Sequence, residues 1–148
     1  MAIHYNTIDV RAPKIERREI TNWIKQVATQ HQKRVGEITY IFCSDDEILR
    51  INREYLKHDY YTDIITFDYS EKDRISGDLF ISLDTVKSNS EQYNTDFIEE
   101  IRRVMIHGIL HLCGFNDKSP EDEKLMRQKE DKALSLVYSF TPNSFTKK

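Results

Sequence analysis

The chain has 148 residues, a formal net charge of −3, 39% hydrophobic and 32% charged residues, and few glycines or prolines. This composition fits one soluble globular domain and excludes a low-complexity or linker-rich chain. The small net charge also excludes binding of nucleic acid through bulk positive charge, so such a partner would require a local basic patch.

The chain carries no signal for membranes or secretion. No apolar run approaches the roughly 18 residues of a membrane span, and the first residues lack the apolar core of a signal peptide. We therefore expect a cytoplasmic protein that does not enter a membrane. Cys43 and Cys113 stand in apolar surroundings and are expected to be reduced and buried rather than joined in a disulfide.

The first half of the chain predicts strands and helices in alternation. Alternating apolar residues predict a strand at 3–8, helical spacing predicts a helix over about 15–35, and a β-branched and aromatic run predicts a strand at 38–42. Ser44 with Glu47 three residues later forms the pattern of a capping box, which opens a second helix.

The second half of the chain predicts two further strands and three helices. Strands are expected at 64–67 and 79–82, joined by a polar loop over 68–77. Asp84 is expected to cap a helix that runs to about residue 93, Thr95 or Asp96 to cap the helix that carries His107 and His111, and Ser119–Pro120 to open the last helix.

Together these elements predict a single α+β domain over residues 1–140, with a mixed sheet of about four strands and about five helices. The helix with the two histidines is apolar around most of its circumference, so we expect it to be central. Residues 141–148 form a polar C-terminal tail.

The segment 107–117 carries the strongest chemical signal. His107 and His111 stand four apart on one helix face, Gly114 can end the helix, and Asp117 follows six residues after His111. Two imidazoles and one carboxylate, with a fourth position open, form the ligand set of a catalytic zinc site. We therefore predict that His107, His111 and Asp117 bind a metal.

The same residues have simpler interpretations. The two histidines could be buried residues that only form hydrogen bonds, and Asp117 could merely stabilise the start of the last helix through the helix dipole. A zinc peptidase would also need a general base directly after the first histidine, in the pattern H-E-x-x-H. That position is Gly108, which cannot accept a proton.

The pattern H-G-x-L-H-L-x-G-[FY] resembles the signature of the YbeY family of metal-dependent endoribonucleases, which act in maturation of ribosomal RNA. Three further segments, in the family's order, are similar to its motifs, and Met126 and Glu130 fit its final helix. The segments are a helix motif ending in N-x-x-Y at 49–55, a D-x-P-T-D-V-L-S-F-like stretch at 59–67 and a G-D-I-x-I-S-like strand at 77–82.

The chain departs from the family's pattern at two chemically important positions. Asp117 stands where the family usually has a third histidine, and its negative charge should make zinc a weaker Lewis acid and favour harder divalent metals. Leu56 stands where the family usually has an arginine thought to hold the RNA phosphate. Arg53, or Lys57 and His58, could supply that charge, or all three could be ordinary solvated surface residues.

The resemblance implies a single-strand-specific endoribonuclease that acts in 16S rRNA maturation and ribosome biogenesis, with one Zn²⁺ or another divalent metal. Its partners would be single-stranded rRNA and the small ribosomal subunit, not DNA. The nucleophile is either zinc-bound water or the RNA 2′-hydroxyl, and the general base is the metal hydroxide or His58. Two alternatives stay open: a zinc-dependent peptidase or amide hydrolase, and a non-catalytic ribosome-assembly factor with a structural metal.

Overall fold

The computed structural model describes residues 2–58 and 62–139, so the predicted tail at 141–148 lies outside the described residues. The elements follow one another as β1 (Ala2–Ile8), α1 (Arg17–Gln30), β2 (Arg34–Cys43), α2 (Asp45–Ile51), a π-helical turn (Asn52–Leu56), β3 (Ile64–Asp68), β4 (Arg74–Ser82), α3 (Leu83–Gln92), α4 (Phe97–Leu112) and α5 (Pro120–Ser139).

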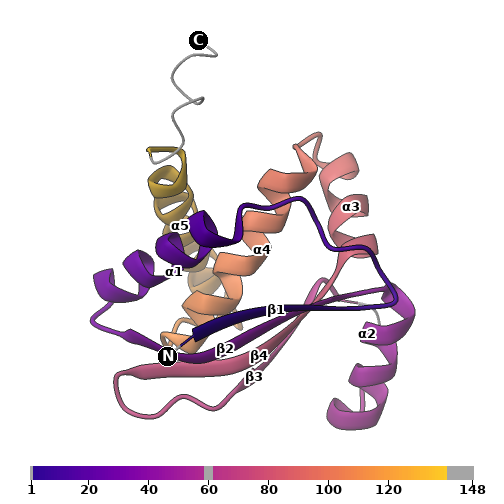
Figure 1. The fold of residues 1–148 in the computed structure, drawn as a ribbon, viewed down its shortest axis with the longest axis horizontal. Coiled ribbons are helices and arrows are strands. Elements are labelled where there is room, and N and C mark those ends of the chain that lie inside the picture. Colours follow the sequence, from indigo (N-terminus) through magenta and orange to yellow (C-terminus); the bar gives the residue numbers. More distant parts are fainter. Residues whose placement is uncertain (1, 59–61, 140–148) are drawn as a thin grey trace.

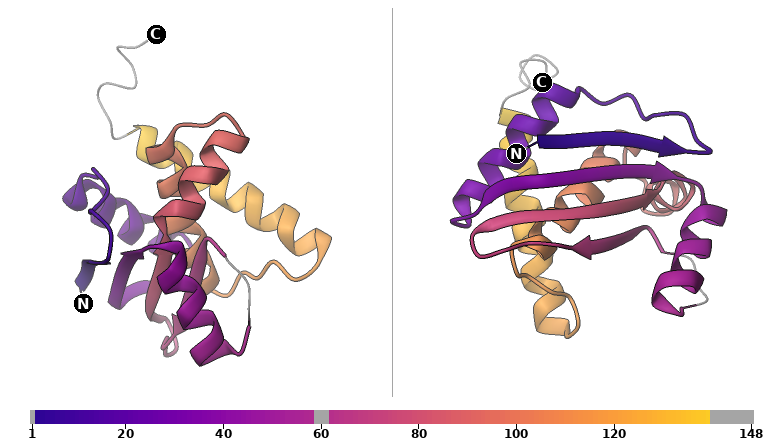
Figure 2. Two further views of the ribbon diagram at one scale, coloured as in Figure 1. Left: turned by 90° about the vertical axis from the view of Figure 1, so that its right-hand side faces the viewer. Right: turned by 60° about the horizontal axis from the view of Figure 1, so that its bottom comes forward.

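The four strands form one mixed sheet in the order β1-β2-β4-β3 (Figure 2, right). β1 and β4 run parallel to β2, and β3 pairs antiparallel with β4 at the edge of the sheet. This arrangement confirms the predicted α+β class and mixed sheet. Helices α1, α3, α4 and α5 lie on one side of the sheet, and α2 lies at its other side near the carboxyl ends of β2 and β4 (Figure 1).

Helix α4 lies at the centre of the main core, as the sequence predicts. Its residues Ile101, Met105 and Ile109 have no exposed surface, and the Tyr40 hydroxyl of β2 donates a hydrogen bond to the Met105 carbonyl at 2.9 Å. Apolar burial of this extent is the main stabilising term in the fold, so α4 is held rigidly against the sheet.

A second, smaller apolar cluster holds α2 against the opposite face of the sheet. Ile48 and Ile51 of α2 pack with Cys43 of β2 and Ile65 of β3. This contact fixes the position of the π-helical turn, which begins at the buried Asn52 directly after α2.

Three predicted helix caps are confirmed. The Ser44 hydroxyl accepts a hydrogen bond from the Glu47 backbone N–H, Asp96 accepts from the N–H groups of Ile98 and Glu99, and Ser119 accepts from Asp122. Each of these side chains satisfies a donor that the first turn of the helix leaves without a partner.

Other predicted boundaries are wrong. α1 ends at Gln30, and Val35, predicted within that helix, belongs to β2. The chain turns at Gln32, whose φ of 58° lies in the left-handed region, and Val35 then pairs with Ile75 of β4. The prediction missed this turn because it used only the local helical spacing of apolar residues. The start of β2 is set instead by its pairing with β4, a strand distant in the sequence.

The hairpin between β3 and β4 also differs from the prediction. β4 begins at Arg74, so much of the predicted polar loop over 68–77 is strand. The cap of α3 is Ser82, whose hydroxyl accepts from the Thr85 N–H, and not Asp84. Asp84 instead accepts a hydrogen bond from the Asp45 N–H at the start of α2, a tertiary contact that local sequence does not reveal.

Two further expectations concern cysteines and membranes. Cys43 and Cys113 are both free thiols; Cys43 is buried as predicted, whereas Cys113, at the end of α4, is only half-buried. Among the described residues, no helix combines the length and the apolar character needed to span a bilayer.

Gly108 of α4 packs directly against the sheet. A Cβ at this position would lie 2.1 Å from Leu79 Cδ2 and 2.9 Å from Ile64 Cδ1. Gly108→Ala is expected to destabilise the protein by about 2 kcal/mol, because an overpacking cost of about 3 kcal/mol outweighs the roughly 1 kcal/mol that alanine gains in a helix. Urea denaturation measures this difference, and Gln128→Ala on the exposed face of α5 should change stability by less than about 0.5 kcal/mol. Unchanged stability of Gly108→Ala would contradict the close packing.

Candidate metal centre

The site is built at the carboxyl end of α4. The rings of His107 and His111, one turn apart, lie with their centroids 4.9 Å from each other at an angle of 80°. The helix then ends in a Schellman motif, in which the Gly114 N–H donates to the His111 carbonyl and the Phe115 N–H donates to the Leu110 carbonyl. Gly114 has a φ of 107°, so this reversal suits glycine.

The reversal brings Asp117 back to the two histidines. Its Oδ2 lies 3.3 Å from His107 Nε2, and its Oδ1 lies 3.6 Å from His111 Nε2. One ligand atom from each of the three residues lies within 4.8 Å of the other two. The structure therefore brings together all three predicted ligands.

These donors fit a divalent metal. Two imidazole nitrogens and a carboxylate oxygen suit zinc, and the carboxylate also suits harder cations. All three side chains are only partly buried, so a fourth position can remain open to solvent or substrate. The group could therefore hold a metal, as predicted from the spacing.

A buried ion-pair network supports His107 from behind. Its Nδ1 lies 2.6 Å from Glu130 Oε2 on α5, and the other Glu130 oxygen accepts a hydrogen bond from Arg103 at 2.8 Å. Arg103 also donates to Asp131 at 2.7 Å. The side chain of Glu130 is only 8% exposed. A carboxylate at Nδ1 directs the lone pair of Nε2 towards the metal position, an arrangement common in metal sites.

The two histidines differ in their electrostatic surroundings. Burial alone lowers the pKa of His107, but the hydrogen bond and charge of Glu130 outweigh it, so the pKa is raised overall. Burial and the neighbouring His107 lower the pKa of His111. The nearby Asp117 carboxylate partly opposes this lowering.

The three candidate ligands open into a cavity of about 380 Å³ at the edge of the sheet. Asp63, just before β3, and Thr66 and Asp68 of β3 line one wall, and the π-helical turn lines another with Asn52 and Leu56. Burial raises the pKa of the Asp63 carboxyl, although His107 partly opposes this. The described residues that line this cavity include several carboxylates but no lysine or arginine.

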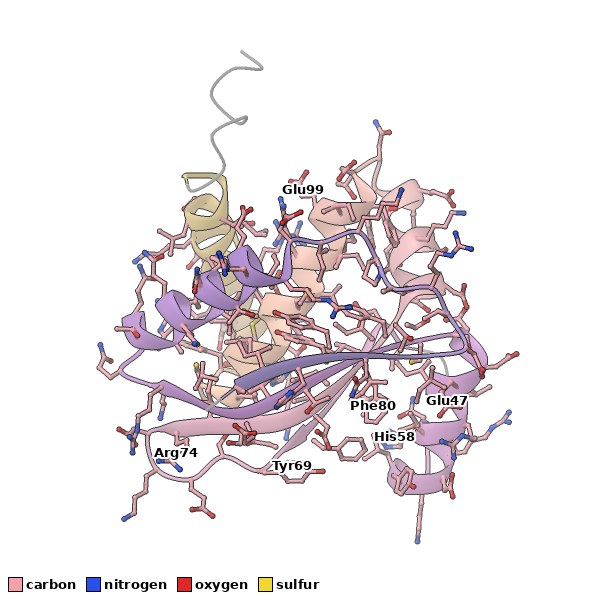
Figure 3. All side chains as sticks on the ribbon, in the orientation of Figure 1. Glu47, His58, Tyr69, Arg74, Phe80 and Glu99 are labelled. Atoms are coloured by element: carbon pink, nitrogen blue, oxygen red, sulfur yellow. The ribbon has the colours of Figure 1, made fainter. Side chains whose placement is uncertain are left out.

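Three further residues were predicted for the site, namely His58, Arg53 and Lys57, and they do not all lie in this cavity. His58 lines the cavity, and its backbone N–H donates to the Asn52 carbonyl at 3.0 Å, which anchors it to the turn beside α2 (Figure 3). Arg53 and Lys57 are exposed and are not among the described residues that line the cavity. Of the three, only His58 therefore lies in the same cavity as His107, His111 and Asp117.

Sequence reasoning did not assign a role to Glu130, Arg103 or Asp63. A signal for Glu130 was present, because a charged residue there interrupts the apolar stripe of α5 formed by Met126, Ala133 and Val137. Asp63 gave no comparable signal, since its burial depends on where β3 meets α4.

The fold and site define a single-domain α+β protein with a two-histidine, one-aspartate candidate metal centre at the end of a buried helix. The sequence model of Endoribonuclease YbeY matches residues 5–137. The chain therefore belongs to this family, which confirms the resemblance and the expected class of enzyme, an endoribonuclease.

Individual relatives agree with this assignment. Proteins named Endoribonuclease YbeY are similar at 62% identity over 136 residues in Bacteroides fragilis and at 63% over 135 residues in Phocaeicola vulgatus. These matches cover 92% and 91% of this chain, and 98% of each relative. The solution structure of TM1509 from Thermotoga maritima has a TM-score of 0.68 at 26% identity and covers 93% of this chain and 90% of that one.

Proposed function

We propose that the chain is a cytoplasmic, metal-dependent endoribonuclease that cleaves single-stranded RNA in 16S rRNA maturation on the small ribosomal subunit. The observation that carries this proposal is the convergence of His107, His111 and Asp117 within one cavity in a chain of this family. Residues 1–140 would act as one catalytic domain, which the family match over residues 5–137 supports.

His107, His111 and Asp117 would hold the metal, one Zn²⁺ or a harder divalent ion. When bound, it supplies Lewis-acid chemistry, which activates water and polarises a phosphoryl oxygen. Glu130 would keep His107 in the tautomer whose Nε2 lone pair can bind a metal.

His58 is the side chain that we propose for proton transfer. It lines the same cavity as the candidate ligands, and an imidazole can both accept and donate a proton. The ring would accept the proton of the attacking water or 2′-hydroxyl and would pass a proton to the RNA oxygen that leaves phosphorus when the phosphodiester bond breaks. Arg53 and Lys57 on the adjacent turn would contact phosphates outside the cavity, because both side chains are exposed.

Removal of the metal tests this function. We expect the protein to cleave an unstructured RNA oligonucleotide, to lose cleavage completely after treatment with a chelator, and to regain it when Zn²⁺ or Mn²⁺ is added back. A DNA oligonucleotide of the same sequence and an unstructured peptide should stay intact. Cleavage of the peptide alone would support the peptidase alternative, and bound metal without any cleavage would support an assembly factor.

A further inference from the structure

A basic patch lies next to the metal centre and has no role in the site described above. It consists of Lys129 and Lys132 on α5, whose charges act on His31 at the end of α1, and of Lys33, whose charge acts on the Cys113 thiol two residues before Phe115. The His31 ring meets the Phe115 ring edge-on at 5.0 Å, and Lys129 Nζ lies 5.6 Å from the centre of the same ring.

The positive charge of this patch is not neutralised locally. Within the part of the chain that the structure describes, Lys33, Lys129 and Lys132 form no ion pair with a carboxylate. Lys129 and Lys132 are one turn apart, and neither has an acidic residue three or four positions away on α5. Burial and these two lysines lower the pKa of His31, so the patch owes its charge to the three lysines.

The patch is joined to the metal centre through one residue. The Phe115 N–H donates to the Leu110 carbonyl in the turn that brings Asp117 back to the histidines, and the Phe115 side chain contacts His31 and Lys129. In contrast, the described lining of the metal cavity has Asp63, Asp68 and Asp117 but no lysine or arginine. The acidic wall does not attract a polyanion, so RNA that reaches the metal and extends past Arg53 and Lys57 would gain from further positive charge on the α5 side.

We propose that Lys33, Lys129 and Lys132 bind the phosphate backbone of the single-stranded RNA on one side of the cleaved bond. This inference rests on the proposed function and adds a binding surface to it. Flexible lysines suit this purpose, because they attract phosphates as point charges without fixing a sequence. The cation–π contact of the Lys129 ammonium with the Phe115 ring keeps one of these charges close to the loop that leads to Asp117.

The test compares RNA binding by a triple variant and two matched variants. In Lys33→Gln/Lys129→Gln/Lys132→Gln the stems remain but the charges are lost. We expect it to bind a fluorescent, unstructured RNA about tenfold more weakly at 0.1 M salt, with the slope of log K against log salt reduced by about 2. The triple Lys→Arg variant keeps the charges and should bind like the wild-type protein.

The charge-matched control is Arg11→Gln/Lys14→Gln/Arg18→Gln. These three exposed residues lie before and at the start of α1, the other end of that helix from His31, and should leave affinity and slope close to wild type. Circular dichroism and thermal denaturation establish that every variant is folded.

Equal affinity of the lysine triple variant and the wild-type protein would overturn the inference, as would equal losses in the two neutralised variants. Because the readout is binding, the proposed function is judged separately. If the lysine triple variant binds RNA more weakly but neither it nor the wild-type protein cleaves RNA, the nuclease function is contradicted and the binding patch is supported. Cleavage with no binding difference would overturn the patch alone.

Discussion

Substitution of Asp117 by alanine is expected to reduce bound metal from about one equivalent per chain to a small fraction. Asp117 is the one candidate ligand outside α4, and its two oxygens lie 3.3 and 3.6 Å from the histidine nitrogens. Loss of a ligand should weaken metal binding by more than about 100-fold, since loss of an outer hydrogen-bond partner already costs roughly 10- to 100-fold. Elemental mass spectrometry on protein purified without a chelator or a histidine tag measures the metal content.

Two further variants test whether Asp117 is a metal ligand or only stabilises the start of α5. Asp122→Ala removes an acidic side chain from the first turn of α5 without touching the histidines, and should keep its metal. Asp117→His supplies a third imidazole, and should retain zinc and cleave RNA at least as fast as wild type, because a neutral ligand leaves zinc a stronger Lewis acid. Equal metal in Asp117→Ala and wild type would show that Asp117 is not a ligand.

Substitution of Glu130 by glutamine is expected to weaken metal binding by about tenfold, and Glu130→Ala by about 100-fold. Glutamine can still accept a hydrogen bond from His107 but lacks the charge that raises the pKa of that ring and makes it a better donor to a metal. Alanine also leaves the half-buried Arg103 without its main partner, so this variant should be less stable as well. Competition with a metal-binding dye measures the affinity.

Asp131→Asn is the matched control for this pair. Asp131 accepts a hydrogen bond from the same Arg103 but is 59% exposed, and it pairs with Arg103 rather than with His107. Its substitution should change metal affinity by less than about twofold. If Glu130→Gln and Asp131→Asn bound metal equally well, the role of Glu130 in orienting His107 would be disproved.

The parts of the site that sequence predicts well are those built from neighbouring residues. His107, His111, Gly114 and Asp117 lie within eleven residues, and one helix with a glycine end is enough to bring them together. The three confirmed caps belong to the same category, because a cap connects a side chain to a backbone group two or three residues away.

The starts of β2 and β4 were predicted less well, because pairing with a distant strand determines where each begins. The start of β2 and the start of β4 depend on the pairing of Val35 with Ile75, two residues whose own neighbourhoods favour a helix and a loop. The replacement of Asp84 by Ser82 as the cap of α3 has the same origin, since Asp84 is engaged by the start of α2.

The sequence by itself determined the α+β class, the central helix and the three candidate metal ligands, because helical periodicity and short-range spacing define them. Only the tertiary structure decided which other groups surround these ligands. Glu130 reaches His107 from 23 residues away, His58 enters the cavity through the π-helical turn, and His31 and Lys129 meet at the Phe115 ring. These contacts arise from the packing of α5, α1 and α2 around the sheet and α4, and no local pattern encodes such packing.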